Sequence, residues 1–367
     1  MQLSNFYRDW ILAGLVLITA LYVSATVPRV CQAGDHQAPQ REELRYGGKS
    51  FDWWRNELRT ELKAELRVEA IDALGAFGSN GYAEEAAAAI IDVVKVYDVA
   101  SNDRDDKSIT SAVGRALRKI GPGAAPAVIA ALNGSDKQSR LYAARVLSRY
   151  RLDESVVPAL IAAVQDEDPH VRRGAILALS RNVGEAATEE AVHKLIAAMH
   201  DDDLETRCNA ADALGHVAPN GTSATTVLVA AMTDKHWMLR QKAVEALRAM
   251  RPNPAVIEPA EVETIERQDR ELVVPALIDA LDDEHRTVRQ LVLDLIARIG
   301  RPAKAAVPAL IEAFHNVDPH DRYLVARALG NIGPDAEEAL PIMIRATQAK
   351  DEGLQKAAAN AVKQISK

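Results

Sequence analysis

From residue 51 onward, apolar residues recur along the chain with helical spacing. A large aliphatic residue repeatedly follows a small or β-branched one by four positions, and residues four apart share one face of a helix. We call the large residue of each pair the anchor. The anchors recur every 30 to 49 residues, at Leu74, Leu117, Leu147, Leu179, Leu214, Leu247, Ile296, Leu329 and Val362. A period of this length predicts a stack of similar helical units.

A second helix is predicted before each anchor helix. It carries the pattern Val-Pro-Ala-Leu, and weaker copies occur in other units; the clearest cases are residues 157–160, 274–277 and 307–310. Proline costs little there because the N–H groups of a first helical turn have no acceptor within the helix. Glycine-containing and proline-containing turns end most units. We therefore predict about nine pairs of helix A and helix B within residues 51–367, with no strands.

These features resemble those of HEAT repeats. The shared elements are a proline in helix A, the pattern Asp-x-x-Val-Arg opening helix B (Asp168 to Arg172), and the ladder of small residues and leucines. The units also resemble the short HEAT-like repeats of phycobilisome chromophore lyases, and residues 46–78 look like the start of exported bacterial HEAT proteins. The resemblance implies an all-α, right-handed α-solenoid. It leaves the function open, since such repeats serve scaffolds, adaptors and a few enzymes.

Seven positions before the anchor, most units carry an arginine. Seven residues return a helix to within about 20° of its starting direction, so each arginine lies near the buried face and needs a partner. Aspartate four residues earlier is placed to cap helix B, and its carboxylate is expected to meet an arginine of the neighbouring unit. This predicts a structural ladder of Arg67, Arg140, Arg172, Arg207, Arg240, Arg289, Arg322, Asp136, Asp168, Asp203 and Asp318.

The acidic segment Asp166-Glu167-Asp168 with His170 looks by itself like a metal or acid–base site. Similar acidic segments recur at the same turn in other units, which favours helix caps stabilised by the helix dipole. Weak Ca²⁺ binding is the alternative, although these turns lack the ligand spacing of a calcium loop. No histidine is followed by glutamate, which argues against a di-iron hydroxylase. We predict no catalytic residue, no metal and no cofactor.

Positions two before and two after each anchor point away from the core. In HEAT-like arrays the B helices generally line the concave surface, so these positions are candidates for partner binding. They are basic in the early units, at Arg115, Lys119, Arg145, Arg149 and Arg181, and acidic in the middle ones, at Asp212, Glu245 and Asp294. The hypothesis is a groove of two signs for a segment of mixed charge or an anionic ligand. The alternative is ordinary solvated helix surface.

Composition and the N-terminus narrow the function further. The net charge of −8 argues against a nucleic-acid binder. Residues 10–27 carry no charge and predict either a signal peptide, cleaved after Ala25, or an uncleaved membrane anchor. Either one places the remainder outside the cytoplasm, periplasmic or secreted if cleaved and membrane-anchored otherwise. Residues 31–50 are predicted as a linker, and an acidic insertion at about 251–270 as a loop.

We therefore expect a non-catalytic, monomeric scaffold or adaptor that binds a protein partner through its concave B-helix surface. The alternative is a lyase, or a lyase subunit, of the HEAT-like chromophore-lyase type.

Overall fold

The computed structural model describes residues 44–61, 63–93, 104–152, 154–182, 189–218, 221–251 and 259–367. Residues 10–27, and with them the predicted signal peptide or anchor, lie outside this part of the chain, as does most of the predicted linker. None of the helices in the described ranges is both long enough and apolar enough to span a bilayer.

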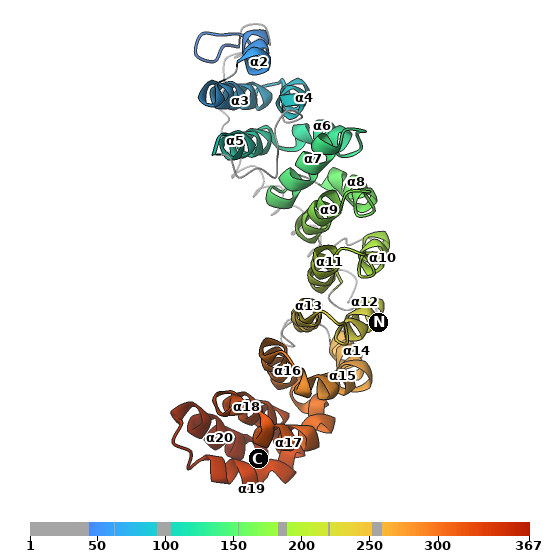
Figure 1. Cartoon of the computed structure of the whole chain (residues 1–367), viewed down its shortest axis with the longest axis vertical. Helices are drawn as coiled ribbons and strands as arrows, with labels where there is room; N and C mark the ends of the chain where they lie inside the picture. The colour runs from blue at the N-terminus through green and yellow to red at the C-terminus, as the bar shows by residue number, and fades with distance from the viewer. Residues whose placement is uncertain are drawn as a thin grey trace, which may run out of the picture. The chain divides into compact units, whose positions relative to one another are not determined.

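Residues Phe51–Lys367 form one compact unit of paired helices, which confirms the predicted all-α solenoid. The helices stack in two rows, with the A helices in one and the B helices in the other (Figure 1). The A helices are α2 (Phe51–Thr60), α4 (Ala83–Val93), α6 (Ala125–Leu132), α8 (Val157–Ala163), α10 (Glu189–Ala198), α12 (Thr222–Ala231), α15 (Val274–Asp279), α17 (Val307–Asn316) and α19 (Leu340–Ala346). The B helices are α3 (Ala64–Gly78), α5 (Arg104–Ile120), α7 (Lys137–Arg149), α9 (Pro169–Asn182), α11 (Leu204–Val217), α13 (Trp237–Ala249), α16 (Arg286–Ile299), α18 (Arg322–Ile332) and α20 (Glu352–Ile365).

The anchors form the core of this stack. Every anchor from Leu74 to Leu329 is fully buried, and so is the small residue four positions before each of them. Val362, the anchor of α20, is only half-buried; within the described residues α20 packs against α18 and α19. The proline of Val-Pro-Ala-Leu lies in the first turn of α8, α15 and α17, where its missing N–H removes no hydrogen bond from the helix.

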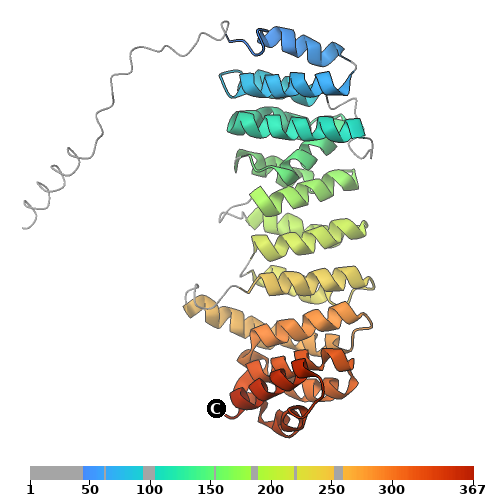
Figure 2. The same ribbon diagram turned by 90° about the vertical axis from the view of Figure 1, so that its left-hand side faces the viewer.

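Neighbouring B helices approach closely where glycine follows the anchor. A Cβ atom added to Gly215 would lie 2.9 Å from the Cα of Ala246, and one on Gly330 would lie 2.9 Å from the Cα of Ala361. Small residues at these contacts let the backbones of consecutive B helices pack directly. The B helices consequently lie side by side along the stack, and they are seen face-on in Figure 2.

The predicted insertion contains a helix rather than a loop alone. Residues Pro259–Gln268 form α14, which continues through a π-helical turn, Asp269–Val273, into α15. Side-chain hydrogen bonds from Gln268 to Thr222 and from Thr225 to Gln268 tie the end of α14 to α12. Arg251 and Asp269, both buried, form an ion pair in which Nε donates to Oδ1 at 2.8 Å. The insertion is therefore anchored by buried polar contacts that its acidic composition did not indicate.

Candidate functional site

The column of arginines joins consecutive A–B turns. Arg140 donates from Nε to Asp166 at 2.8 Å, which lies in the turn of the next unit, and from Nη1 to the carbonyl of Ser135 at 3.0 Å in its own turn. Its side chain and that of Asp166 are each only 10% exposed. One guanidinium thus satisfies acceptors in two units, which suits its planar array of donors.

The same arrangement recurs twice more. Arg172 pairs with Asp201 at 2.7 Å, and Arg240 pairs with Asp283 at 2.6 Å. The acceptor in each pair lies two residues before the position predicted from the sequence. The carboxylate of Asp201 also accepts the backbone N–H of Asp203, and the carboxylate of Asp283 accepts that of His285, which fixes each acceptor within its turn. The arginine column therefore pairs with Asp166, Asp201 and Asp283. Of the cap aspartates, Asp203 also meets an arginine of the neighbouring unit, Arg173, at 3.1 Å.

The predicted cap aspartates do accept backbone N–H groups at the start of the next helix. Asp136 accepts from Ser139, Asp203 from Thr206, and Asp318 from His320. Asp168 accepts from His170 and Val171 and pairs with Lys137 at 2.6 Å. Burial acts to raise the pKa of Asp168, but the bonds from Lys137 and the two backbone N–H groups outweigh it and hold that pKa below its ordinary value.

The other predicted ladder arginines bond only partly in this way. Arg207 and Arg289 each donate to a carbonyl of their own turn, at 2.7 and 2.6 Å. Arg67 donates to the carbonyl of Glu61. Arg322 lies over the ring of Phe314, with its Cζ 5.8 Å from the ring centroid. The ladder is thus interrupted, and its charges are used within the fold where it is present.

The acidic residues predicted for partner binding are paired with neighbouring basic residues. Lys242 lies 3.6 Å from Asp212 and 2.9 Å from Glu245. Asp294 pairs with Arg248 at 3.3 Å and Arg327 at 2.5 Å. The acidic half of the predicted groove therefore carries its own counter-charges.

The basic residues gather on the exposed side of three consecutive B helices. They lie toward the C-terminal ends of α5, α7 and α9, and no acidic residue occurs within α7 or α9. We define the basic cluster as Arg115, Arg118, Lys119, Arg145, Arg149 and Arg181. Arg145 is half-buried and the others are exposed; Arg115 also pairs with Asp72 of α3 at 3.4 Å. Basic side chains near helix C-termini are favoured by the helix dipole, so the positions themselves cost little.

Two contacts between units hold this cluster in place. Tyr150, the residue after α7, packs against Gly114, where an added Cβ would lie 2.2 Å from the ring. The Cζ of Arg118 lies 5.8 Å from the centroid of the same ring, within range of a cation–π contact. Arg181 donates from Nη1 to the carbonyl of Ser148 at 2.6 Å, which draws it toward the end of α7. Our sequence reasoning missed Arg118 because it considered only positions two residues from the anchor.

Arg145 and Arg149 stand one helical turn apart on α7. Burial lowers the pKa of Arg145, and the like charge of Arg149 lowers it further. Like charges four residues apart on a helix are destabilising. The cluster therefore includes a repulsion that an anion bound beside α7 would relieve.

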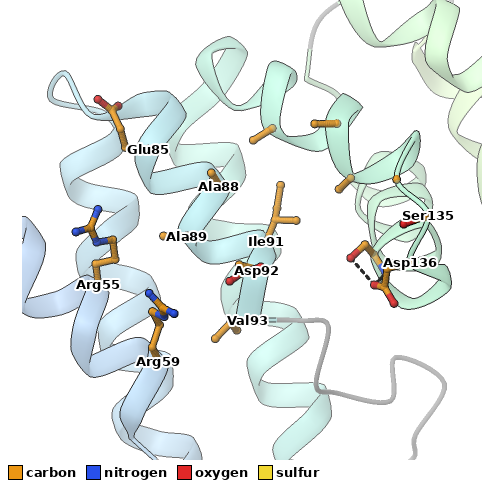
Figure 3. Close-up of a pocket in the computed structure, with 15 residues that line it drawn as sticks. Arg55, Arg59, Glu85, Ala88, Ala89, Ile91, Asp92, Val93, Ser135 and Asp136 are labelled. Atoms are coloured by element: carbon orange, nitrogen blue, oxygen red, sulfur yellow. Dashed lines mark hydrogen bonds between the residues drawn. The ribbon is translucent and has the colours of Figure 1, made fainter.

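A hollow lies on the other row, between α2, α4 and α6 (Figure 3). Its volume is about 810 Å³, and alanines of α4 and α6 form much of its lining. Arg55 and Arg59 border it from α2, and Asp136 borders it from the start of α7. Val93 forms part of its edge, and the ten residues after Val93 lie outside the described chain. We assign no site to this hollow.

Within the described ranges, no three His, Cys, Asp or Glu side chains are grouped so that they could hold a metal ion. Cys208 lies half-buried in α11, and burial raises the pKa of its thiol. A raised pKa keeps less of the reactive thiolate at neutral pH.

Stacked helical hairpins with a continuous apolar core define the chain as a helical-repeat protein. The HEAT repeat family profile matches residues 125–203, 192–261 and 274–363, which together make up more than half of the sequence. The chain belongs to the HEAT repeat family. A search of curated proteins found no match.

Solved structures with a similar fold include two engineered proteins of the Northeast Structural Genomics Consortium. The first is 21% identical with a TM-score of 0.53, and the alignment covers 88% of this chain and 90% of the other. The second is 18% identical with a TM-score of 0.42, covering 66% of this chain and 96% of the other. At such identities the likeness of the first concerns the fold alone.

Proposed function

We propose that the chain is a non-catalytic scaffold that binds a protein partner on the exposed side of its B helices, at the basic cluster. HEAT repeat proteins are generally protein-binding scaffolds. The observation that carries the proposal is the placement of charge along the B helices: the C-terminal ends of α5, α7 and α9 bring exposed basic residues together, and neither α7 nor α9 contains an acidic residue. Such a patch attracts and orients an oppositely charged surface.

The arginines at the A–B turns differ from the basic cluster in that their charges are paired within the fold. Arg140, Arg172 and Arg240 each bond to acceptors of two consecutive turns and pair with a carboxylate, so their charge is neutralised inside the fold. The basic cluster projects into solvent from helices that pack directly on one another. A partner that crosses several B helices would thus meet charges held at fixed spacing.

The proposal includes a chain that acts as a monomer, without cofactor or nucleic acid. It also includes export, supported by the uncharged residues 10–27 and the flanking Arg8 and Arg29. Mass spectrometry of the mature N-terminus distinguishes a cleaved signal peptide from an anchor. An intact chain in the cytoplasmic fraction would contradict both.

Reversing the charge of the cluster is expected to abolish partner recovery. The variant Arg115→Glu/Arg145→Glu/Arg149→Glu replaces attraction by repulsion, and affinity purification from cells that make the chain should recover its partners at least about tenfold less well. Quantitative mass spectrometry measures the recovery, and circular dichroism checks that the variant remains helical.

The matched control reverses three exposed basic residues that lie outside the B helices: Lys304→Glu/Arg345→Glu/Lys350→Glu. It changes the net charge by the same amount and should leave partner recovery as in the wild type. Equal recovery by the cluster variant, or an equal loss in the control, would contradict the proposed surface.

A further inference from the structure

The spacing of the basic cluster restricts what can bind it. Its side chains come from three consecutive B helices, and packed helices lie about 8–10 Å apart. The pair α7 and α9 is closely packed, since a Cβ on Gly174 would lie 2.8 Å from the Cβ of Ala144. The cluster therefore presents one group of positive charge about every 8–10 Å along the stack.

This step matches an extended peptide. A polyproline II chain advances about 3.1 Å per residue with three residues per turn, so every third side chain lies on one face, about 9 Å from the last. A β-strand does not fit, because its side chains alternate between two faces. A chain crossing α5, α7 and α9 would place every third side chain beside a basic group. Crossing the three helices takes about seven residues, which puts three such side chains in contact.

The anchoring contacts favour recognition over loose attraction. Arg118 rests over the ring of Tyr150, and Arg181 is bonded to the carbonyl of Ser148. These side chains lose less freedom when they bind a carboxylate than unanchored ones would. Arginine also binds a carboxylate by donating two parallel N–H hydrogen bonds to its oxygens. The repulsion between Arg145 and Arg149 falls when an anion binds between them.

We infer that the basic cluster recognises an extended protein segment with an acidic residue at every third position, lying across α5, α7 and α9. The inference rests on the proposed function and specifies its partner. A polyanion without this spacing is a different kind of ligand, because it would be attracted by net positive charge alone. The chain as a whole carries net negative charge and would repel it.

Fluorescence anisotropy on the full chain tests the spacing directly. The probe is a fluorescein-labelled nonapeptide of three Glu-Pro-Ser units, in which proline favours the extended form. A second probe has the same composition with its three glutamates consecutive. The periodic peptide should bind at least about fivefold more tightly, because only its carboxylates match the step between helices.

Two variants check that binding occurs at the cluster. Arg145→Glu/Arg149→Glu should weaken the periodic peptide at least about tenfold, and Arg345→Glu/Lys350→Glu, with the same change of net charge, should leave it within about twofold. Equal affinity for the two peptides, equal loss in both variants, or equally tight binding of a single-stranded oligonucleotide would overturn the inference. If the peptides fail while the charge-reversed cluster still loses its protein partners, the spacing is wrong and the proposed function stands.

Discussion

Replacing Arg240 with methionine is expected to lower the free energy of unfolding by about 3–5 kcal/mol, because it leaves a buried charge without its partner. Arg240 and Asp283 are 9% and 6% exposed, and the guanidinium also donates to the carbonyl of Asp234 at 2.9 Å. The damage should be local to the junction of α13 and α16, since units of a repeat stack contact only their neighbours. Urea denaturation gives the size of the loss, and hydrogen exchange in α13 and α16 locates it.

The pH dependence follows from Asp283. Burial acts to raise its pKa, but bonds from Arg240 and the N–H of His285 outweigh burial and hold the pKa below the ordinary 3.8. A lowered pKa gives stability that is present above 3.8 and lost as the pH falls through the folded-state value. In the variant Asp283 loses the bond from Arg240, so its folded-state pKa is higher than in the wild type, and the deficit should shrink as the pH falls through the interval between these two pKa values. Arg248→Met is the control: Arg248 is 44% exposed, and its loss should cost less than about 1 kcal/mol.

Arg251→Met is expected to destabilise the chain by about 3–5 kcal/mol for the same reason at a different place. Burial raises the pKa of Asp269, and the ion pair with Arg251 opposes that rise. Without Arg251 the pKa of Asp269 rises further, and the buried carboxylate must either lose its charge or disrupt the junction of α14 and α15. Protease resistance near residue 259 and urea denaturation both measure the loss.

The two variants should differ in their response to acid. A raised folded-state pKa gives stability below the unfolded value and loses it as the pH rises. The folded-state pKa of Asp269 lies above 3.8 in the wild type and rises further in the variant, whereas that of Asp283 lies below 3.8 in the wild type. The deficit of Arg251→Met should therefore be lost at a higher pH than the deficit of Arg240→Met. The double variant Arg251→Met/Asp269→Leu should recover most of the stability, since an apolar pair leaves no buried charge. A double variant as unstable as the single one would contradict this account.

The fold could be predicted from the sequence because the information is local and repeated. Each unit repeats an anchor, a small residue four positions earlier and a proline in helix A. The helix positions inferred for one unit therefore support those inferred for the next. The helix α14 was missed because its residues occur once in the chain. Its contacts with Thr222 and Arg251 come from segments that the repeat pattern did not connect with it.

The site was predicted less completely. The sequence indicates that an acidic turn meets the arginine of the preceding unit. Asp166 and Asp168 are only two residues apart, so either could be the carboxylate that pairs with this arginine. Only the turn geometry decides that Asp168 caps α9 while Asp166 faces Arg140. The counter-charges of the acidic positions were not predicted, for a related reason. The counter-charge of Asp294 comes from Arg248 and Arg327, on the B helices to either side of it, and a helix-by-helix count of outward positions omits such pairs.

Site-specific photo-crosslinking tests the central claim, that a protein partner binds the B-helix side at the basic cluster. A benzophenone side chain placed at Lys119 or Arg149 should form covalent adducts with the partner in cells that make the chain. The same group at Glu312 or Arg345, both exposed and on the A-helix row, should not. Adducts from the A-helix positions, with none from Lys119 or Arg149, would contradict the account.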